Sequence, residues 1–79
     1  MKHYVVILDW ATNDEESVDI LGVFHTFEEA EEVFKSHLDY ERRLAEEKEY
    51  IVNEDFSSFM AYAEGYYAAE HTQLYIQGV

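Results

Sequence analysis

The stretch Thr26-Phe27-Glu28-Glu29-Ala30 separates two hydrophobic patterns in this 79-residue sequence. Before it, apolar residues alternate with the period of a strand, whereas after it they recur at three- and four-residue spacing, as in an amphipathic helix. Thr26 and Glu29 have the spacing of a capping box, in which the threonine hydroxyl accepts the backbone N–H of position 29 and the glutamate reaches back to the N–H of position 26. The sequence therefore predicts that a helix begins here.

The predicted helix has an apolar stripe that would pack on a sheet and a charged side that would face solvent. We expect it to fray or end between Glu46 and Tyr50, because three glutamates there would meet the negative end of the helix dipole. The expected stripe consists of Ala30, Val33, Phe34, His37, Tyr40 and Leu44, and the charged side of Glu28, Glu31, Glu32, Lys35, Asp39, Arg42, Arg43 and Glu46.

Two strands are predicted before the helix. Tyr4 to Trp10 alternates β-branched and aromatic residues, and Val18 to His25 is a second apolar segment. The polar residues 12–17 between them favour a turn, so we expect a hairpin. Gly22 interrupts the second strand and indicates either a bulge or a close approach by the crossing helix.

Two further strands are predicted after the helix, Ser58 to Ala63 and Thr72 to Gln77, with Ile51 to Asp55 as a connector and a turn at Glu64-Gly65. Residues 56–69 also contain aromatic side chains at helical spacing, so a short helix remains an alternative there. The predicted fold is a single α+β domain over residues 1–79, ββαββ, in which an antiparallel sheet has one helix packed across one face.

Charge restricts the possible partners. Five Lys and Arg against eighteen Asp and Glu give a net charge of −13, which disfavours binding to nucleic acid or anionic lipid and favours a basic protein. The chain has no cysteine, no apolar run of the length that a membrane span needs, and an acid at position 9 that argues against a signal sequence. We therefore expect a cytoplasmic protein.

No catalytic or metal-binding motif is present. Four histidines occur without zinc-binding spacing, and His37 with Glu41 makes only half of a metal site. Residues 13–16, an asparagine followed by three acids, are rich in oxygen ligands but lack the spacing of a calcium loop. We expect a protein that is not an enzyme and has no metal or cofactor, with a small enzyme or metalloprotein as the third interpretation.

Acids without a helical lysine or arginine partner form two groups, Glu28, Glu29 and Glu32 at the helix start and Glu49, Glu54 and Asp55 beyond its end. Acids four apart on a helix lie about 6 Å apart along its axis, comparable with the phosphate spacing of a nucleic-acid strand. These six acids are candidate contacts to a basic partner. Tyrosines crowd the last third of the chain, and we expect Tyr66 and Tyr67 to be either interface anchors or core residues.

The closing phrase from Gly65 to Ile76 (Gly-Tyr-Tyr-Ala-Ala-Glu-His-Thr-Gln-Leu-Tyr-Ile) resembles the ends of small single-domain proteins of phages and mobile elements of Gram-positive bacteria. Length, acidity and the lack of Cys and Pro are also similar to that group, which includes acidic anti-CRISPR and other anti-defence inhibitors. The resemblance implies a nucleic-acid mimic that occludes a basic nucleic-acid-binding surface of a host protein. The alternative is an α+β interaction module or homodimer that uses an aromatic patch and is acidic for solubility only.

Overall fold

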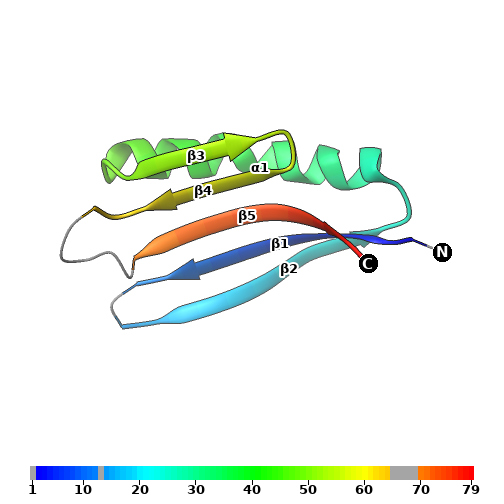
Figure 1. Cartoon of the computed structure of the whole chain (residues 1–79), viewed down its shortest axis with the longest axis horizontal. Coiled ribbons are helices and arrows are strands. Elements are labelled where there is room, and N and C mark those ends of the chain that lie inside the picture. The colour runs from blue at the N-terminus through cyan, green and yellow to red at the C-terminus, as the bar shows by residue number, and fades with distance from the viewer. Residues whose placement is uncertain (1, 13, 65–69) are drawn as a thin grey trace.

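The fold is α+β, as predicted, with one antiparallel sheet and a single helix packed across one of its faces (Figure 1). The computed structural model describes residues 2–12, 14–64 and 70–79. The elements are β1 (Tyr4–Ala11), β2 (Glu16–Phe24), α1 (Phe27–Glu47), β3 (Ile51–Asp55), β4 (Ser58–Tyr62) and β5 (His71–Gly78).

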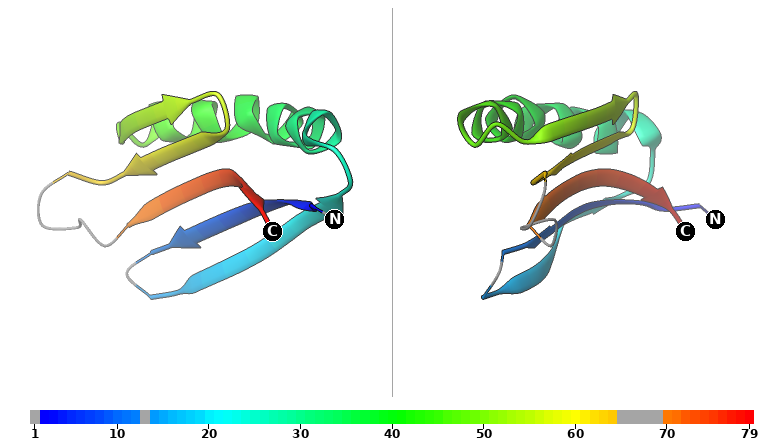
Figure 2. Two further views of the ribbon diagram at one scale, coloured as in Figure 1. Left: turned by 45° about the vertical axis from the view of Figure 1, so that its right-hand side comes forward. Right: turned by 60° about the vertical axis from the view of Figure 1, so that its left-hand side comes forward.

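The last strand lies in the middle of the sheet. The strand order is β2-β1-β5-β4-β3, so β5 joins the hairpin that precedes the helix to the hairpin that follows it. Every neighbouring pair is antiparallel. The two further views in Figure 2 show the twist of the sheet, with α1 on one side of it. The central position of β5 explains its apolar residues, since Leu74 is fully buried.

The predicted connector at Ile51 to Asp55 is wrong, because these residues form β3, which pairs with β4. All five residues of β3 are exposed at the sheet edge, so no burial imposes an alternating apolar pattern on them. The strand predicted at Ser58 to Ala63 is confirmed over Ser58–Tyr62, which excludes a helix for that part. Residues 65–69, including the second half of the predicted turn, lie outside the described residues.

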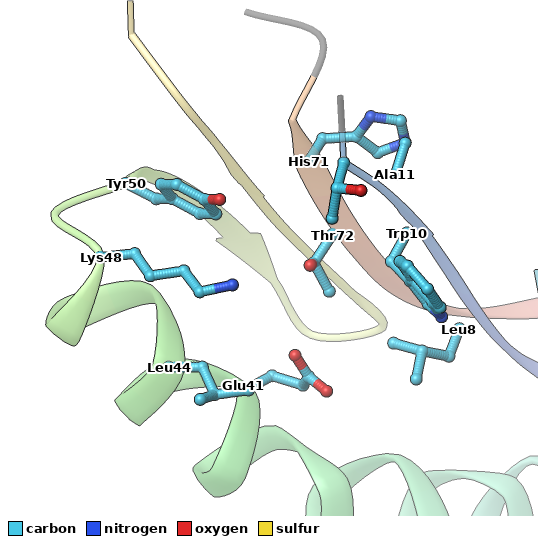
Figure 3. A pocket seen from close by; sticks show the side chains of 10 residues that line it. Leu8, Trp10, Ala11, Glu41, Leu44, Lys48, Tyr50, His71 and Thr72 are labelled. Atoms are coloured by element: carbon cyan, nitrogen blue, oxygen red, sulfur yellow. The ribbon is translucent and has the colours of Figure 1, made fainter. Parts of the chain in front are cut away.

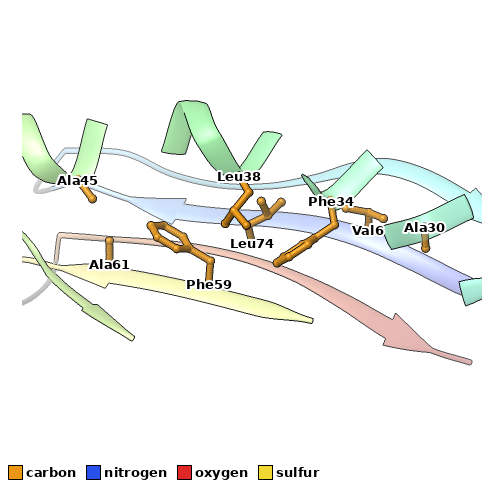
Figure 4. Packing of buried hydrophobic residues seen from close by; sticks show 8 residues of the cluster. All are labelled: Val6, Ala30, Phe34, Leu38, Ala45, Phe59, Ala61 and Leu74. Atoms are coloured by element: carbon orange, nitrogen blue, oxygen red, sulfur yellow. The ribbon is translucent and has the colours of Figure 1, made fainter. Parts of the chain in front are cut away.

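The core lies between α1 and the sheet (Figure 4), and its largest fully buried side chains are Phe34, Phe59, Leu74 and Val6. The buried stripe of α1 differs from the predicted one: Leu38 is buried, whereas Tyr40 is 56% exposed. The buried helical residues are Ala30, Phe34, Leu38, Glu41 and Ala45, a face of the helix rotated slightly from the predicted one.

Thr26 is confirmed as the N-cap of α1, but the Glu29 carboxylate meets the Thr26 hydroxyl and not, as predicted, the Thr26 backbone N–H. The Thr26 hydroxyl accepts the backbone N–H of Glu29 at 3.2 Å and donates to the Glu29 carboxylate at 3.0 Å. The helix ends at Glu47, inside the range where we expected it to end, and has no basic residue in its last turn. Glu49 then adopts a left-handed conformation with φ of 57°, which turns the chain toward β3.

Gly22 lies beside a bulge, which was one of the two explanations predicted for this glycine. The register between β1 and β2 shifts between Val6 and Ile7, which leaves Leu21 of β2 without a partner on β1. The group that lies close to Gly22 is the aromatic ring of Phe24, and not the helix as the other explanation predicted. A Cβ atom at Gly22 would lie 2.4 Å from Phe24 Cζ.

Candidate functional site

The predicted acids at the helix start lie together and are exposed. Glu28, Glu29 and Glu32 fall in the first two turns of α1. Lys35, the first cation of the helix, pairs with Glu31, four residues before it, at 3.5 Å. The three exposed carboxylates therefore form a small anionic surface, which we call the α1 acidic end.

The second predicted group of acids is not one patch. Glu49 precedes β3 whereas Glu54 and Asp55 are its last two residues, so the first three residues of the strand, roughly 10 Å of extended chain, lie between them. Glu54 accepts from Arg42 Nη2 at 2.6 Å, an ion pair that links α1 to β3. Arg42 also approaches Asp39, three residues before it on the helix, at 3.6 Å. The charge of Glu54 is thus compensated.

Asp55 has a local structural role. Its carboxylate accepts the backbone N–H of Ser57 at 2.9 Å, at the turn between β3 and β4. This backbone hydrogen bond, followed by bonding to Ser58, holds the pKa of Asp55 below its usual value. The two predicted anchor tyrosines, Tyr66 and Tyr67, lie outside the described residues.

A pocket of about 270 Å³ opens where the C-terminal half of α1 faces β1 and β5 (Figure 3). Leu8, Trp10 and Leu44 give it an apolar wall. Its polar groups come from two sides, since Glu41 and Lys48 belong to the helix and its cap whereas Thr72 is the second residue of the facing strand, β5. Sequence reasoning missed this site because its residues are far apart along the chain.

Glu41 is the most unusual side chain of the pocket. It is a charged residue that is only 8% exposed, among the buried residues of α1. Burial raises the pKa of the Glu41 carboxyl group, against the opposing attraction of His37 and Lys48. Among the residues that the structure describes, no hydrogen bond reaches the Glu41 carboxylate. The sequence does hold a signal for this burial, since Glu41 lies seven residues after Phe34 and hence on the same helix face.

Other ionisable groups surround the pocket. The Tyr50 hydroxyl donates to the Glu70 carboxylate at 3.5 Å, and burial with this acidic neighbour raises the pKa of Tyr50. Lys48 Nζ lies 5.6 Å from the centre of the Tyr50 ring, within the range of a cation–π contact. His71 at the rim approaches Asp9 at 3.7 Å. The pocket thus combines apolar walls with groups of both charge signs.

The sheet face opposite α1 is a separate surface, which we call the open face. Val18, Ile20 and Val23 of β2 project from it and are 57–63% exposed. Ile20 is paired across the sheet with Ile7, which is paired in turn with Tyr75. This row of apolar side chains crosses three strands on the face that α1 does not cover.

The described residues contain no group of three histidines, aspartates or glutamates that could hold a metal ion. Within the same ranges, α1 is too polar to cross a membrane, and no other helix occurs there.

Comparison with models of known protein families, with curated proteins and with solved structures finds no match to this chain.

Proposed function

We propose that this protein is a non-enzymatic binding protein that acts in the cytoplasm and presents the α1 acidic end to a basic, nucleic-acid-binding surface of another protein. In this role it is an anionic mimic that competes with the polynucleotide, the activity implied by its resemblance to anti-CRISPR and anti-defence inhibitors. The observation that supports the proposal most directly is the position of Glu28, Glu29 and Glu32, all exposed on two adjoining turns.

The physical argument is electrostatic. A net charge of −13 attracts basic surfaces at long range. At short range, carboxylates on a rigid helix lose little conformational freedom when they meet lysine or arginine, which favours binding. The first two turns of α1 contain four glutamates and no cation, whereas later turns include Lys35, Arg42 and Arg43. The helix start is therefore the part of α1 that best fits a basic groove.

The experiment compares two triple variants with the same change in net charge. E28Q/E29Q/E32Q neutralises the α1 acidic end and keeps a glutamine at the capping-box position, which preserves the cap. D14N/E15Q/E16Q neutralises three acids of the β1–β2 turn region as a matched control. Each protein is immobilised and offered a Gram-positive bacterial lysate, and bound proteins are eluted with duplex DNA.

We expect a protein from the lysate to bind the immobilised wild type and the control variant but not E28Q/E29Q/E32Q. Duplex DNA or high salt should displace this lysate protein. Equal loss with both variants would show that net charge alone governs retention and would contradict a specific surface. Retention that neither DNA nor salt can reverse would also contradict the proposal.

A second function is favoured by the open face, namely self-association. The molecule measures 43 by 21 Å along its two longer axes, about 900 Å², and a standard interface buries roughly 800 Å² per partner. Asp9, the acid of β1 on this face, lies beside His71. The other acids of this face, Glu16 and Asp55, lie on the two edge strands, so a second copy could pack sheet against sheet through the apolar row.

Sedimentation velocity tests self-association with two variants, each at a residue whose side chain has nearly the same exposed fraction. Ile20 on the open face is 57% exposed, and Tyr40 on α1 is 56% exposed. We expect a wild-type dimer that I20E dissociates and Y40E leaves intact. A wild-type monomer at high protein concentration, or a dimer that survives I20E, would refute self-association through the open face.

A further inference from the structure

The pocket beside Glu41 has features that the proposed protein contacts do not use. Figure 3 shows the Glu41 carboxylate and the Lys48 ammonium group directed toward the same space, with Trp10 and Leu8 across from them. The two charged residues are seven positions apart, about two helical turns, so they share a face of the helix. They attract each other, yet among the described residues they form no ion pair within 4 Å.

Glu41 is only 8% exposed and its carboxylate has no protein partner in the described part of the chain, so its ionised form is poorly solvated, which is costly. A positively charged group on a ligand would supply that partner. A ligand with a positive charge alone would meet repulsion from Lys48, and one with a negative charge alone would meet repulsion from ionised Glu41. A ligand that has both charges on adjoining atoms satisfies both residues.

The remaining walls define the rest of the ligand. Leu8, Trp10 and Leu44 offer an apolar surface that includes an indole ring. A pocket of about 270 Å³ lies just below the roughly 300 Å³ at which sites for drug-sized molecules begin, so a smaller molecule suits it. The Thr72 hydroxyl on the facing strand can both donate and accept a hydrogen bond.

We propose that this pocket binds a free α-amino acid with an apolar side chain, its ammonium group paired with Glu41, its carboxylate with Lys48 and its side chain against Trp10. The pairing is noncovalent. This site lies on the core side of α1 toward its C-terminal end, whereas the α1 acidic end lies at the other terminus, so the two binding activities are independent.

Trp10 is the sole tryptophan of the chain, so its fluorescence reports binding at the pocket wall. The probes are L-phenylalanine, phenethylamine, which lacks the carboxylate, and 3-phenylpropanoate, which lacks the ammonium group. Excitation at the red edge of the indole band avoids absorption by all three. We expect L-phenylalanine to bind about tenfold or more tightly than either analogue, since each analogue loses one charge-assisted hydrogen bond.

Variants assign the two charged contacts. E41Q and K48M are each expected to weaken L-phenylalanine binding about tenfold, by loss of one charged partner. E46Q removes a charge from an exposed position of the same helix and should leave the affinity unchanged. Circular dichroism confirms that each variant is folded, and E41Q removes a buried charge, so loss of binding by this variant is not expected to reflect unfolding.

Two results would overturn the proposal. One is the absence of saturable L-phenylalanine binding in the millimolar range. The other is phenethylamine or 3-phenylpropanoate binding as tightly as L-phenylalanine, because the paired charges would then have no part in recognition. An undiminished affinity of E41Q would likewise exclude Glu41 as the partner of the ammonium group.

Discussion

A methyl group added at Gly22 should destabilise the fold through a single clash. The new Cβ would lie 2.4 Å from Phe24 Cζ and 2.6 Å from its Cε2, closer than nonbonded carbons pack. Phe24 packs against the core, so its ring must move and lose contacts. We expect the clash in G22A to cost about 1–3 kcal/mol, the usual range for overpacking, offset by about 0.5–1 kcal/mol from replacing a glycine within a strand.

The second variant of this test is F24L, which removes the ring atoms that clash. In the F24L background we expect G22A to be neutral or to stabilise by about 0.5 kcal/mol, because the backbone of Gly22 lies outside the left-handed region. The coupling free energy between the two positions is then about 1–3 kcal/mol. Urea unfolding followed by circular dichroism measures the four free energies of unfolding, with an unchanged m-value as the check on two-state behaviour.

An equal cost of G22A in both backgrounds would refute this reasoning, because the ring of Phe24 would then not be the obstacle. It would place the constraint in the backbone of the bulge itself, where a side chain of any kind is disfavoured.

Two other substitutions test separate features. Burial raises the pKa of Glu41 above its unfolded value of 4.5, although the charges of His37 and Lys48 oppose this shift. Above the folded pKa the carboxylate is ionised and lowers the stability of the fold. This penalty disappears as the pH falls toward 4.5. E41Q should therefore be more stable than the wild type at neutral pH, by a margin that shrinks toward pH 5 in thermal melts, while exposed E46Q shows no such trend; a constant margin would contradict the assignment. T26A should lower the free energy of unfolding by about 1 kcal/mol in urea titrations, since it removes the cap hydroxyl of α1, and a loss below about 0.2 kcal/mol would mean that the cap contributes nothing measurable.

β1, β2, α1, β4 and β5 could be predicted from their apolar patterns, whereas β3 could not. β1 alternates because its even positions from Tyr4 to Leu8 pack toward the helix, and α1 begins at a cap that local chemistry specifies. β3 has the composition of a loop, since a strand at the edge of the sheet with both faces wet has no reason to alternate. Its strand conformation follows from the hairpin with β4, a tertiary effect.

The residues of the candidate site also divide into those that the sequence could predict and those that it could not. The exposure of Glu28 and its neighbours could be read from helical spacing, because that property depends on one element. The Arg42–Glu54 pair could not, because helical spacing supplies Asp39 as a closer partner in sequence and only the packing of α1 beside β3 brings Glu54 within reach. The pocket forms where α1, β1 and β5 come together, and the sequence alone does not give the distances between these elements.

The two protein contacts proposed here respond to salt in opposite directions, which follows from the location of charge on this molecule. The α1 acidic end attracts a basic partner, and dissolved ions screen that attraction over a Debye length of about 10 Å at 0.1 M. Two copies that meet through their open faces each have a net charge of −13, so the same ions weaken the repulsion between them and favour the dimer. A complex that weakens with salt therefore uses the acids, and one that strengthens uses the apolar row that includes Ile20 and Ile7. A protein that shows both responses has two independent surfaces, because the acids of the helix start and the side chains of the open face belong to opposite sides of the sheet.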